Sequence, residues 1–286
     1  ALYRGGIVMK LWSRKNKIFS LGILFTVFFI ILAVFADKLN IYDPEKMAMT
    51  EKFIAPCLAH PFGTDHMGRD ILSRIILGSR ISLATSASAV LISAAVGTVL
   101  GMLSGYIGGV ADVLLMRLVD VMLAFPAIVF ALAISTLLGK GQTNLLIAIC
   151  FVQWTRYARV ARGEAIMFKN SEYIQAARTV GNSNVSILIR YVLPHVIPKI
   201  IILISLDIGS IILYCASLSF LGLGAQPPTP DWGVMISEGK DYMQYAPWMT
   251  IFPGLAIAMS ALAFNMLGDG LRDILDPRMK ETVRTE

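Results

Sequence analysis

Charged residues are scarce in this chain, and their scarcity excludes an ordinary soluble domain. Only 15% of the 286 residues are Asp, Glu, Lys or Arg, whereas 56% are hydrophobic and the mean hydropathy is +0.68. Soluble domains carry about 25% charged residues, so this composition offers too little polar side chain to cover a surface exposed to water. The chain is predicted to be an integral membrane protein.

Residues that form disulfides or bind metals are also few. The three cysteines, Cys57, Cys150 and Cys215, are far apart and odd in number, so they predict no disulfide framework. Cys57 shares a segment with His60 and His66, but a closed metal site usually needs four ligands in tighter pairs. We therefore expect no metal site.

The sequence also lacks a nucleotide-binding motif and a continuous basic stripe. Residues 139–143 (GKGQT) do not have the GxxxxGK[ST] spacing of a phosphate-binding loop, so no cofactor is expected in this chain. The net charge is +6, but the basic residues stand beside apolar runs, which favours membrane orientation and argues against nucleic acid as a partner.

Six apolar runs approach the roughly 20 residues that a helix needs to cross a bilayer. They must be helices because unpaired backbone polar groups are too costly in lipid. The predicted spans are residues 18–36, 83–106, 119–138, 145–160, 196–215 and 248–267. The first run lacks a small-residue cleavage site, so it is predicted to be a retained span and not a signal peptide.

Lys and Arg near the ends of the spans predict how the chain is oriented, with both termini in the cytoplasm. The predicted layout is a cytoplasmic segment 1–17, the first span 18–36, an extracytoplasmic loop 37–82, a five-helix core 83–267 and a cytoplasmic tail 268–286. Within the core, residues 161–195 form a cytoplasmic loop and residues 217–247 an extracytoplasmic one.

Residues 172–194 are too polar for a bilayer and too apolar for a plain linker. A helix here would gather Tyr173, Ile174, Ala177 and Val180 on one side and Glu172, Gln175 and Thr179 on the other. Gly181 would end this helix, Asn182 or Ser183 would cap a second short helix, and Pro194 would end that one. The pattern predicts two short helices between two spans.

Individual polar residues and prolines give further expectations. Asp207 is the only clear carboxylate deep in an apolar run, where it would line a path or fix helix packing. Asp231 precedes a segment compatible with a helix and would cap it. Pro126, Pro198 and Pro253 interrupt apolar runs and predict kinks.

The spacing of Gln175-Ala176-Ala177, Gly181 and Leu193-Pro194 resembles the EAA loop of permease subunits from bacterial ABC importers. Gln175 stands where that family has Glu, and Tyr191 where it has Ile. Further motifs are similar to the second permease subunit of the peptide/nickel branch. They are GTD (63–65) with GRD (68–70), LSFLGLG (218–224), PPTP (227–230) with WG (232–233), and LGD (267–269) with LRD (271–273).

This resemblance implies an all-α integral membrane protein of about six transmembrane helices, with the type I ABC importer permease fold and a cytoplasmic coupling helix. The residues implied for ATPase coupling are Glu172, Tyr173, Gln175, Ala176, Ala177, Arg178, Gly181, Leu193 and Pro194. Those implied for the translocation path are Asp207, Cys215 and Asp120. Asp65, Arg69, Asp70 and Trp232 are implied for an extracytoplasmic gate or contact with a binding protein. No catalytic residue is implied.

The resemblance also implies partners in the bacterial cytoplasmic membrane. They are a homologous second permease, two cytoplasmic ATPase subunits that bind ATP and Mg, an extracytoplasmic substrate-binding protein, and membrane lipid. Cys215 stands where peptide-type relatives commonly carry Glu, which favours nickel or a metal chelate as the cargo over a dipeptide or oligopeptide.

Two other classes of function stay open at this point. A stand-alone secondary transporter would normally show internal repeats and several intramembrane ionisable residues, of which this chain offers little beyond Asp207. A membrane-embedded enzyme would need a convergent nucleophile, base and metal, whereas the three histidines fall on separate segments or within a family motif.

Overall fold

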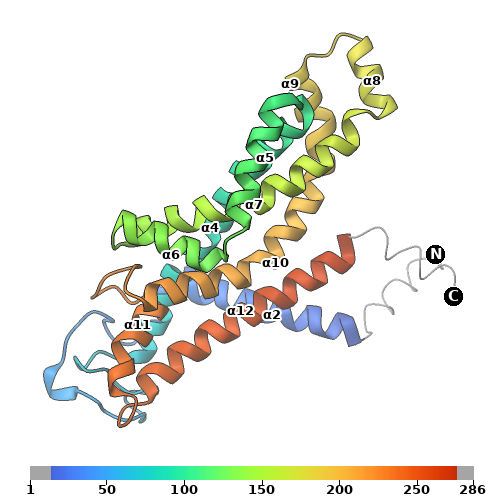
Figure 1. The fold of residues 1–286 in the computed structure, drawn as a ribbon. Helices are drawn as coiled ribbons and strands as arrows, with labels where there is room; N and C mark the ends of the chain where they lie inside the picture. Colours follow the sequence, from blue (N-terminus) through green and yellow to red (C-terminus); the bar gives the residue numbers. More distant parts are fainter. Residues whose placement is uncertain (1–13, 276–286) are drawn as a thin grey trace, which may run out of the picture. The chain divides into compact units, whose positions relative to one another are not determined.

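The computed structural model describes residues 14–275, which form helices joined by loops (Figure 1). Within that range the only extended pairing is an isolated antiparallel bridge between Thr64 and Asp70. The described residues divide into two compact units: unit 1 comprises 14–87, 138–145 and 205–275, and unit 2 comprises 88–137 and 146–204. Each unit has its own buried apolar core.

Unit 1 is built around the first and last helices of the described residues. Helix α2 (Arg14–Val34) packs along α12 (Trp248–Leu275), and the contact depends on small residues. A Cβ on Gly22 would lie 2.9 Å from the backbone nitrogen of Leu267, so only glycine allows this approach. The middle of α10 (Leu193–Phe220) meets α12 in the same way, at Gly268.

The loops of unit 1 fold against this frame. Two short helices, α3 (Ala36–Leu39) and η1 (Met49–Glu51), precede α4 (Ile71–Ile107). Helix α11 (Trp232–Gly239) and the turn η3 (Lys240–Tyr242) pack on α12. The Trp232 ring is fully buried and donates a hydrogen bond from Nε1 to the Ile75 carbonyl at 3.0 Å.

Unit 2 contains the remaining helices and one very close helix contact. A Cβ on Gly97 would lie 2.2 Å from the Trp154 carbonyl, and one on Gly101 2.1 Å from the Ala158 carbonyl. The C-terminal half of α4 therefore lies backbone to backbone against α7. The other elements are α5 (Gly109–Leu123), α6 (Ala127–Leu138), α7 (Gln142–Lys169), α8 (Glu172–Thr179), α9 (Asn184–Ile187) and the π-helical turn η2 (Leu188–Val192).

The helices differ from three of the predicted spans. Helix α4 begins at Ile71, so residues 71–82, predicted as part of a loop, are helical. The predicted span 119–138 is two helices, α5 and α6, bent by 96°. Pro126 explains that break because it lacks an N–H and disfavours helical backbone in the residue before it. The predicted first span 18–36 corresponds to α2, which ends at Val34.

The lengths and compositions of the helices identify fewer candidate spans than the six that were predicted. In the described part of the chain, three helices are long and apolar enough to cross a membrane, or four if α5 and α6 count as one span. Helix α7 falls short because Arg156, Arg159 and Arg162 follow its apolar half. The predicted tail 268–286 continues α12 as far as residue 275. Residues 276–286, and most of the predicted segment 1–17, lie outside the described range.

Candidate functional site

Helix α8, the first half of the predicted coupling loop, begins at a backbone cap. Ser171 has an extended conformation, and its carbonyl accepts hydrogen bonds from the N–H groups of Ile174 and Gln175, both at 3.1 Å. Glu172 occupies the first turn, where a negative charge is favourable at the positive end of the helix dipole. These local interactions explain why the helix starts where the sequence predicts.

The end of α8 is a Schellman motif centred on Gly181. The Gly181 N–H bonds to the Arg178 carbonyl at 2.9 Å, and the Asn182 N–H bonds to the Ala177 carbonyl at 3.1 Å. Gly181 has a φ of +87°, in the left-handed region that glycine adopts readily, and no atom lies within 4 Å of a Cβ built there. The predicted role of Gly181 in ending the helix is confirmed.

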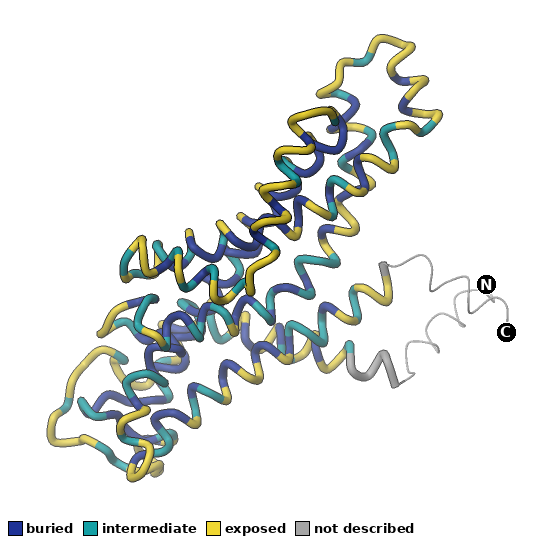
Figure 2. The backbone as a smooth tube through the Cα atoms, in the orientation of Figure 1, coloured by how far each residue is buried: buried dark blue, intermediate teal, exposed yellow. Residues whose placement is uncertain are grey.

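The two faces of α8 differ from the prediction at two positions. Ile174 and Ala177 are buried against Ile187 and Leu188, as expected for an amphipathic helix. Tyr173 is exposed, and Val180 is 82% exposed because the helix has already ended at that residue. The exposed face consists of Glu172, Gln175, Ala176 and Thr179, and most residues around α8 carry the exposed colour in Figure 2.

Some predicted coupling side chains have partners within unit 2. The Gln175 amide donates to the Asn170 carbonyl at 3.1 Å, so the residue that replaces the family Glu stabilises the start of its own helix. The Tyr173 ring stacks on His195 with centroids 5.8 Å apart. The side chain of Ala176 is a single methyl group, so a partner could approach this face of α8 closely.

The second half of the predicted loop runs straight into a long helix. Ser183 caps α9 by accepting a hydrogen bond from the Ser186 N–H, as predicted. The chain then makes the π-helical turn η2, in which the Leu193 N–H bonds to the Leu188 carbonyl. Pro194 lies in the first turn of α10, and the prediction that it ends a helix was wrong. The π-turn changes the backbone pairing just before the proline, whose missing N–H is then tolerated.

The residues predicted to line a translocation path do not all lie in one unit. Asp207 and Cys215 are buried in the half of α10 that belongs to unit 1. Asp120 belongs to α5 in unit 2, where its carboxylate accepts a hydrogen bond from Arg159 Nη2 at 2.7 Å, both side chains being about half exposed.

The residues predicted for an extracytoplasmic gate form a buried polar cluster in unit 1. Arg69 Nε donates to Asp65 Oδ2 at 2.6 Å, and the Asp65 Oδ1 atom accepts the Arg69 backbone N–H at 2.9 Å. Asp70 bonds to the His60 ring at 2.9 Å and accepts the Ser73 N–H. Because these side chains and Trp232 are buried, they hold the loop together in this structure and offer no contact surface.

Two residues of this cluster, Arg74 and Glu238, were missed in the sequence. Arg69 and Arg74, both 1% exposed, bond to the same carboxylate, Glu238 of α11, at 3.1 and 2.9 Å. The second arginine was visible five residues after the first, but no pattern singled out Glu238, which lies 164 residues further on. This ion-pair cluster joins the start of α4 to α11.

Another missed interaction lies in unit 2. Arg162 forms a two-pronged ion pair with Asp112, from Nε at 2.6 Å and Nη2 at 2.7 Å, and Ser104 also donates to this carboxylate. The opposite charges of Asp112 and Arg162, each in a helix that also carries an apolar run, were the available signal, because charged groups in membrane helices normally pair.

The histidine and cysteine side chains of the outer loop have separate environments. Cys57 is exposed, and its Sγ accepts the His60 backbone N–H at 3.4 Å. His60 is buried between Asp70 and the ring of Tyr42, while the His66 ring stacks on Tyr242. No group of three His, Cys, Asp or Glu side chains able to hold a metal ion occurs among the described residues.

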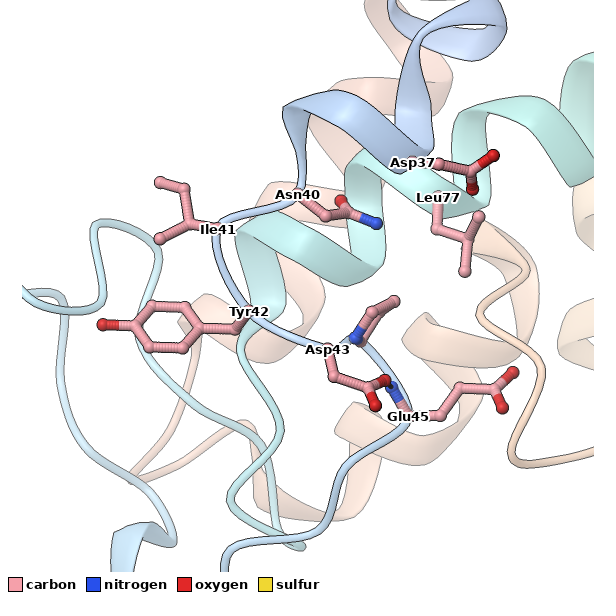
Figure 3. A pocket seen from close by; sticks show the side chains of 8 residues that line it. Asp37, Asn40, Ile41, Tyr42, Asp43, Glu45 and Leu77 are labelled. Atoms are coloured by element: carbon pink, nitrogen blue, oxygen red, sulfur yellow. Dashed lines mark hydrogen bonds between the residues drawn. The ribbon is translucent and has the colours of Figure 1, made fainter.

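An acidic pocket of about 400 Å³ opens in the same outer region (Figure 3). Arg80 pairs with Asp37 at 2.9 Å, and the Glu45 N–H bonds to Asp43 Oδ1 at 3.0 Å, so two of its three carboxylates already have partners. Its wall consists of Asp37, Asn40, Ile41, Tyr42, Asp43, Pro44, Glu45 and Leu77.

Comparison with known proteins gives a consistent assignment. Residues 97–281 match the family described as "Binding-protein-dependent transport system inner membrane component". The chain is 45% identical over 258 residues to the glutathione transport system permease protein GsiD of Pectobacterium atrosepticum, covering 90% of this chain and 86% of that protein. It is 44% identical over 268 residues to the GsiD proteins of Escherichia coli and Shigella boydii, covering 93% of this chain and 88% of each relative. The chain therefore belongs to the family of inner membrane components of binding-protein-dependent transport systems.

Proposed function

We propose that this chain is one permease subunit of an ABC importer for short peptides of the glutathione type. The family assigns it to transport and not to enzymes, with ATP hydrolysis on separate subunits and a binding protein that delivers the cargo. The observation that carries the cargo class is the 44–45% identity to glutathione permeases over about nine tenths of the chain.

The preference for nickel or a metal chelate is not supported. It depended mainly on Cys215, whose side chain is buried in α10 of unit 1. The relatives that match over most of the chain are named for glutathione, a tripeptide, so the alternative of a peptide cargo fits better. One residue is a weaker discriminator than similarity along the whole chain.

The exposed face of α8 is proposed as the contact for an ATPase subunit. Glu172, Gln175, Ala176 and Thr179 share one face of the helix, and they are polar or small, which suits insertion into a cleft better than burial in lipid. We place this end of unit 2 in the cytoplasm because Arg156, Arg159, Arg162, Lys169, Arg178 and Arg190 cluster there.

The assembly is proposed to include a homologous second permease, two ATPases that bind ATP and Mg, and an extracytoplasmic binding protein. The ion-pair cluster of Asp65, Arg69, Arg74 and Glu238 would support the outer surface on which the binding protein docks. In this proposal the buried side chains act by positioning the loop.

The cargo class can be tested by uptake into cells that lack this chain and are complemented with it. Labelled glutathione and labelled dipeptides should accumulate only in complemented cells, while the uptake of labelled nickel should not change. Restored nickel uptake without glutathione or dipeptide uptake would overturn the peptide assignment. A variant with Lys140→Gln, an exposed cation of a short loop outside the proposed contacts, provides an expression control.

A further inference from the structure

A cavity of about 560 Å³ lies in unit 2 where α4 ends beside the segment that carries α8 and α9. Its volume is within the range of about 300–1,000 Å³ typical of ligand pockets. The lining includes Leu103, Ile107, Lys169, Arg178, Val185 and Leu188. The lining of the cavity is therefore partly cationic and partly apolar.

The two cations are held in place but keep unused hydrogen-bond donors. Lys169 Nζ donates to the Ile107 carbonyl at 3.4 Å, which leaves two N–H groups of its ammonium. The Arg178 guanidinium lies 5.2 Å from the centre of the Tyr106 ring, and this stacking leaves the edge donors available. Tyr106 is itself fixed by a hydrogen bond from its hydroxyl to Asn184 at 3.0 Å.

No described carboxylate lies within salt-bridge distance of either cation. Asp112 acts on Lys169 only through its longer-range field, and its carboxylate is already bonded to Arg162 and Ser104. The cavity therefore has an uncompensated positive charge, which favours an anionic ligand.

The apolar wall points to a ligand that is also partly lipidic. Ile107 is 68% exposed and Val185 is 64% exposed, and Leu103 adds a further exposed apolar side chain. Helix α4 is long and apolar enough to cross a membrane and ends at Ile107, so this wall lies where the membrane-spanning helix ends. Cations beside exposed apolar side chains at a helix end are suited to the headgroup region of a bilayer.

We propose that this cavity binds an anionic phospholipid, with the lipid phosphate between Lys169 and Arg178 and an acyl chain against Leu103 and Ile107. Basic pockets at the ends of membrane helices bind phospholipid headgroups by the same chemistry. Since Lys169 ends α7 and Arg178 belongs to α8, one bound lipid connects two helices that a short turn separates. The lipid would then stabilise the orientation of α8.

The test is lipid retention by the full chain, purified with its partner subunits in a gentle detergent and analysed by native mass spectrometry with added phosphatidylglycerol or phosphatidylcholine. The wild type should retain phosphatidylglycerol selectively. Lys169→Gln and Arg178→Gln should each weaken retention about fivefold, because each removes one cation from the headgroup. Lys169→Arg should restore retention, and Arg190→Gln, an exposed cation outside the cavity, should leave it unchanged.

Two further experiments distinguish a bound lipid from other occupants of the cavity. Millimolar inorganic phosphate should not displace the lipid, and a photo-reactive residue at Val185 should give adducts of lipid mass. Equal retention of both lipids by the wild type and the Gln variants would overturn the proposal. Displacement by inorganic phosphate, or adducts at Val185 with an ATPase peptide in place of lipid, would overturn it as well.

Discussion

At the scale of single residues, Asp231 shows how a local sequence signal and a buried environment combine. Its carboxylate caps α11 by accepting the N–H groups of Gly233 and Val234, and it also accepts a hydrogen bond from Ser82 at 3.1 Å. Burial raises the pKa of this carboxyl, although the hydrogen bonds to its charged form oppose that shift. The residue therefore stabilises α11 at the cost of placing a titratable group in the interior.

Replacing Asp231 should separate these two effects. Asp231→Ala loses the cap and leaves Ser82 without its acceptor, which should lower stability by about 1–2 kcal/mol. Asp231→Asn keeps an acceptor oxygen and removes the titration. Because burial raises the folded pKa, the part of the stability that comes from protonating Asp231 is present at low pH and is lost as pH rises through the folded pKa, whereas the cap on α11 remains.

Thermal unfolding in detergent at several pH values checks this prediction. The wild type should lose stability relative to Asp231→Asn as pH rises, while Asp231→Ala should be the least stable of the three near neutral pH. An Asp231→Ala variant as stable as the wild type would contradict the capping role.

The ion-pair cluster supports a second prediction at this scale. Glu238→Gln removes the carboxylate that Arg69 and Arg74 share, leaving two buried guanidinium groups with Asp65 alone. Loss of one partner from a buried ionic cluster costs about 3 kcal/mol or more. Asp241→Asn removes an exposed charge three residues away and is the matched control. Comparable melting temperatures for the two variants would show that the cluster contributes little.

At the scale of elements, the end of α8 and the start of α9 were largely readable from the sequence because these boundaries are local. Ser183 and Gly181 act through hydrogen bonds to residues within a few positions, which the sequence displays directly. The start of α4 at Ile71 and the passage of α10 through Pro194 depend on packing and on an adjusted turn, which no local pattern reveals. Glu238 could not be identified because its partners are distant in the chain.

Gly181 gives a sharp test of the turn after α8. An L-residue in the left-handed region costs about 1–2 kcal/mol, and the open space around Gly181 means that backbone strain is the only penalty. Gly181→Val should therefore change the direction of α8 and reduce uptake strongly. Gly181→Asn should retain most uptake, because asparagine tolerates this conformation.

Membrane fractions must contain equal amounts of both variants for the comparison to hold. If Gly181→Val transports as well as Gly181→Asn, the geometry of this turn does not matter for coupling.

Two glycines of unit 2 make a prediction about helix packing. Gly101→Ala would place a Cβ 2.1 Å from the Ala158 carbonyl, so α4 and α7 must separate at a cost of about 1–3 kcal/mol. Gly163→Ala meets nothing within 4 Å and should stabilise α7 by about 0.5–1 kcal/mol through backbone entropy. Opposite shifts in melting temperature are expected, and equal shifts would argue against close contact of the two backbones.

At the scale of the whole molecule, the chain combines long apolar helices with the exposed helix α8. The family assignment supplies the ATPase and the binding protein, whereas composition alone established only a membrane protein. The cargo could not be predicted from individual residues, because a single replacement such as Cys215 does not define a binding path. Similarity over nine tenths of the chain is the better guide.

The central claim is that this chain transports its cargo only as part of an ATP-driven assembly. The most direct measurement is the uptake of labelled glutathione and dipeptides into vesicles containing the full assembly, with the binding protein outside and ATP inside. We predict uptake that requires both ATP and the binding protein. Uptake by the isolated chain under an ion gradient, without ATP, would contradict the claim and favour a secondary transporter.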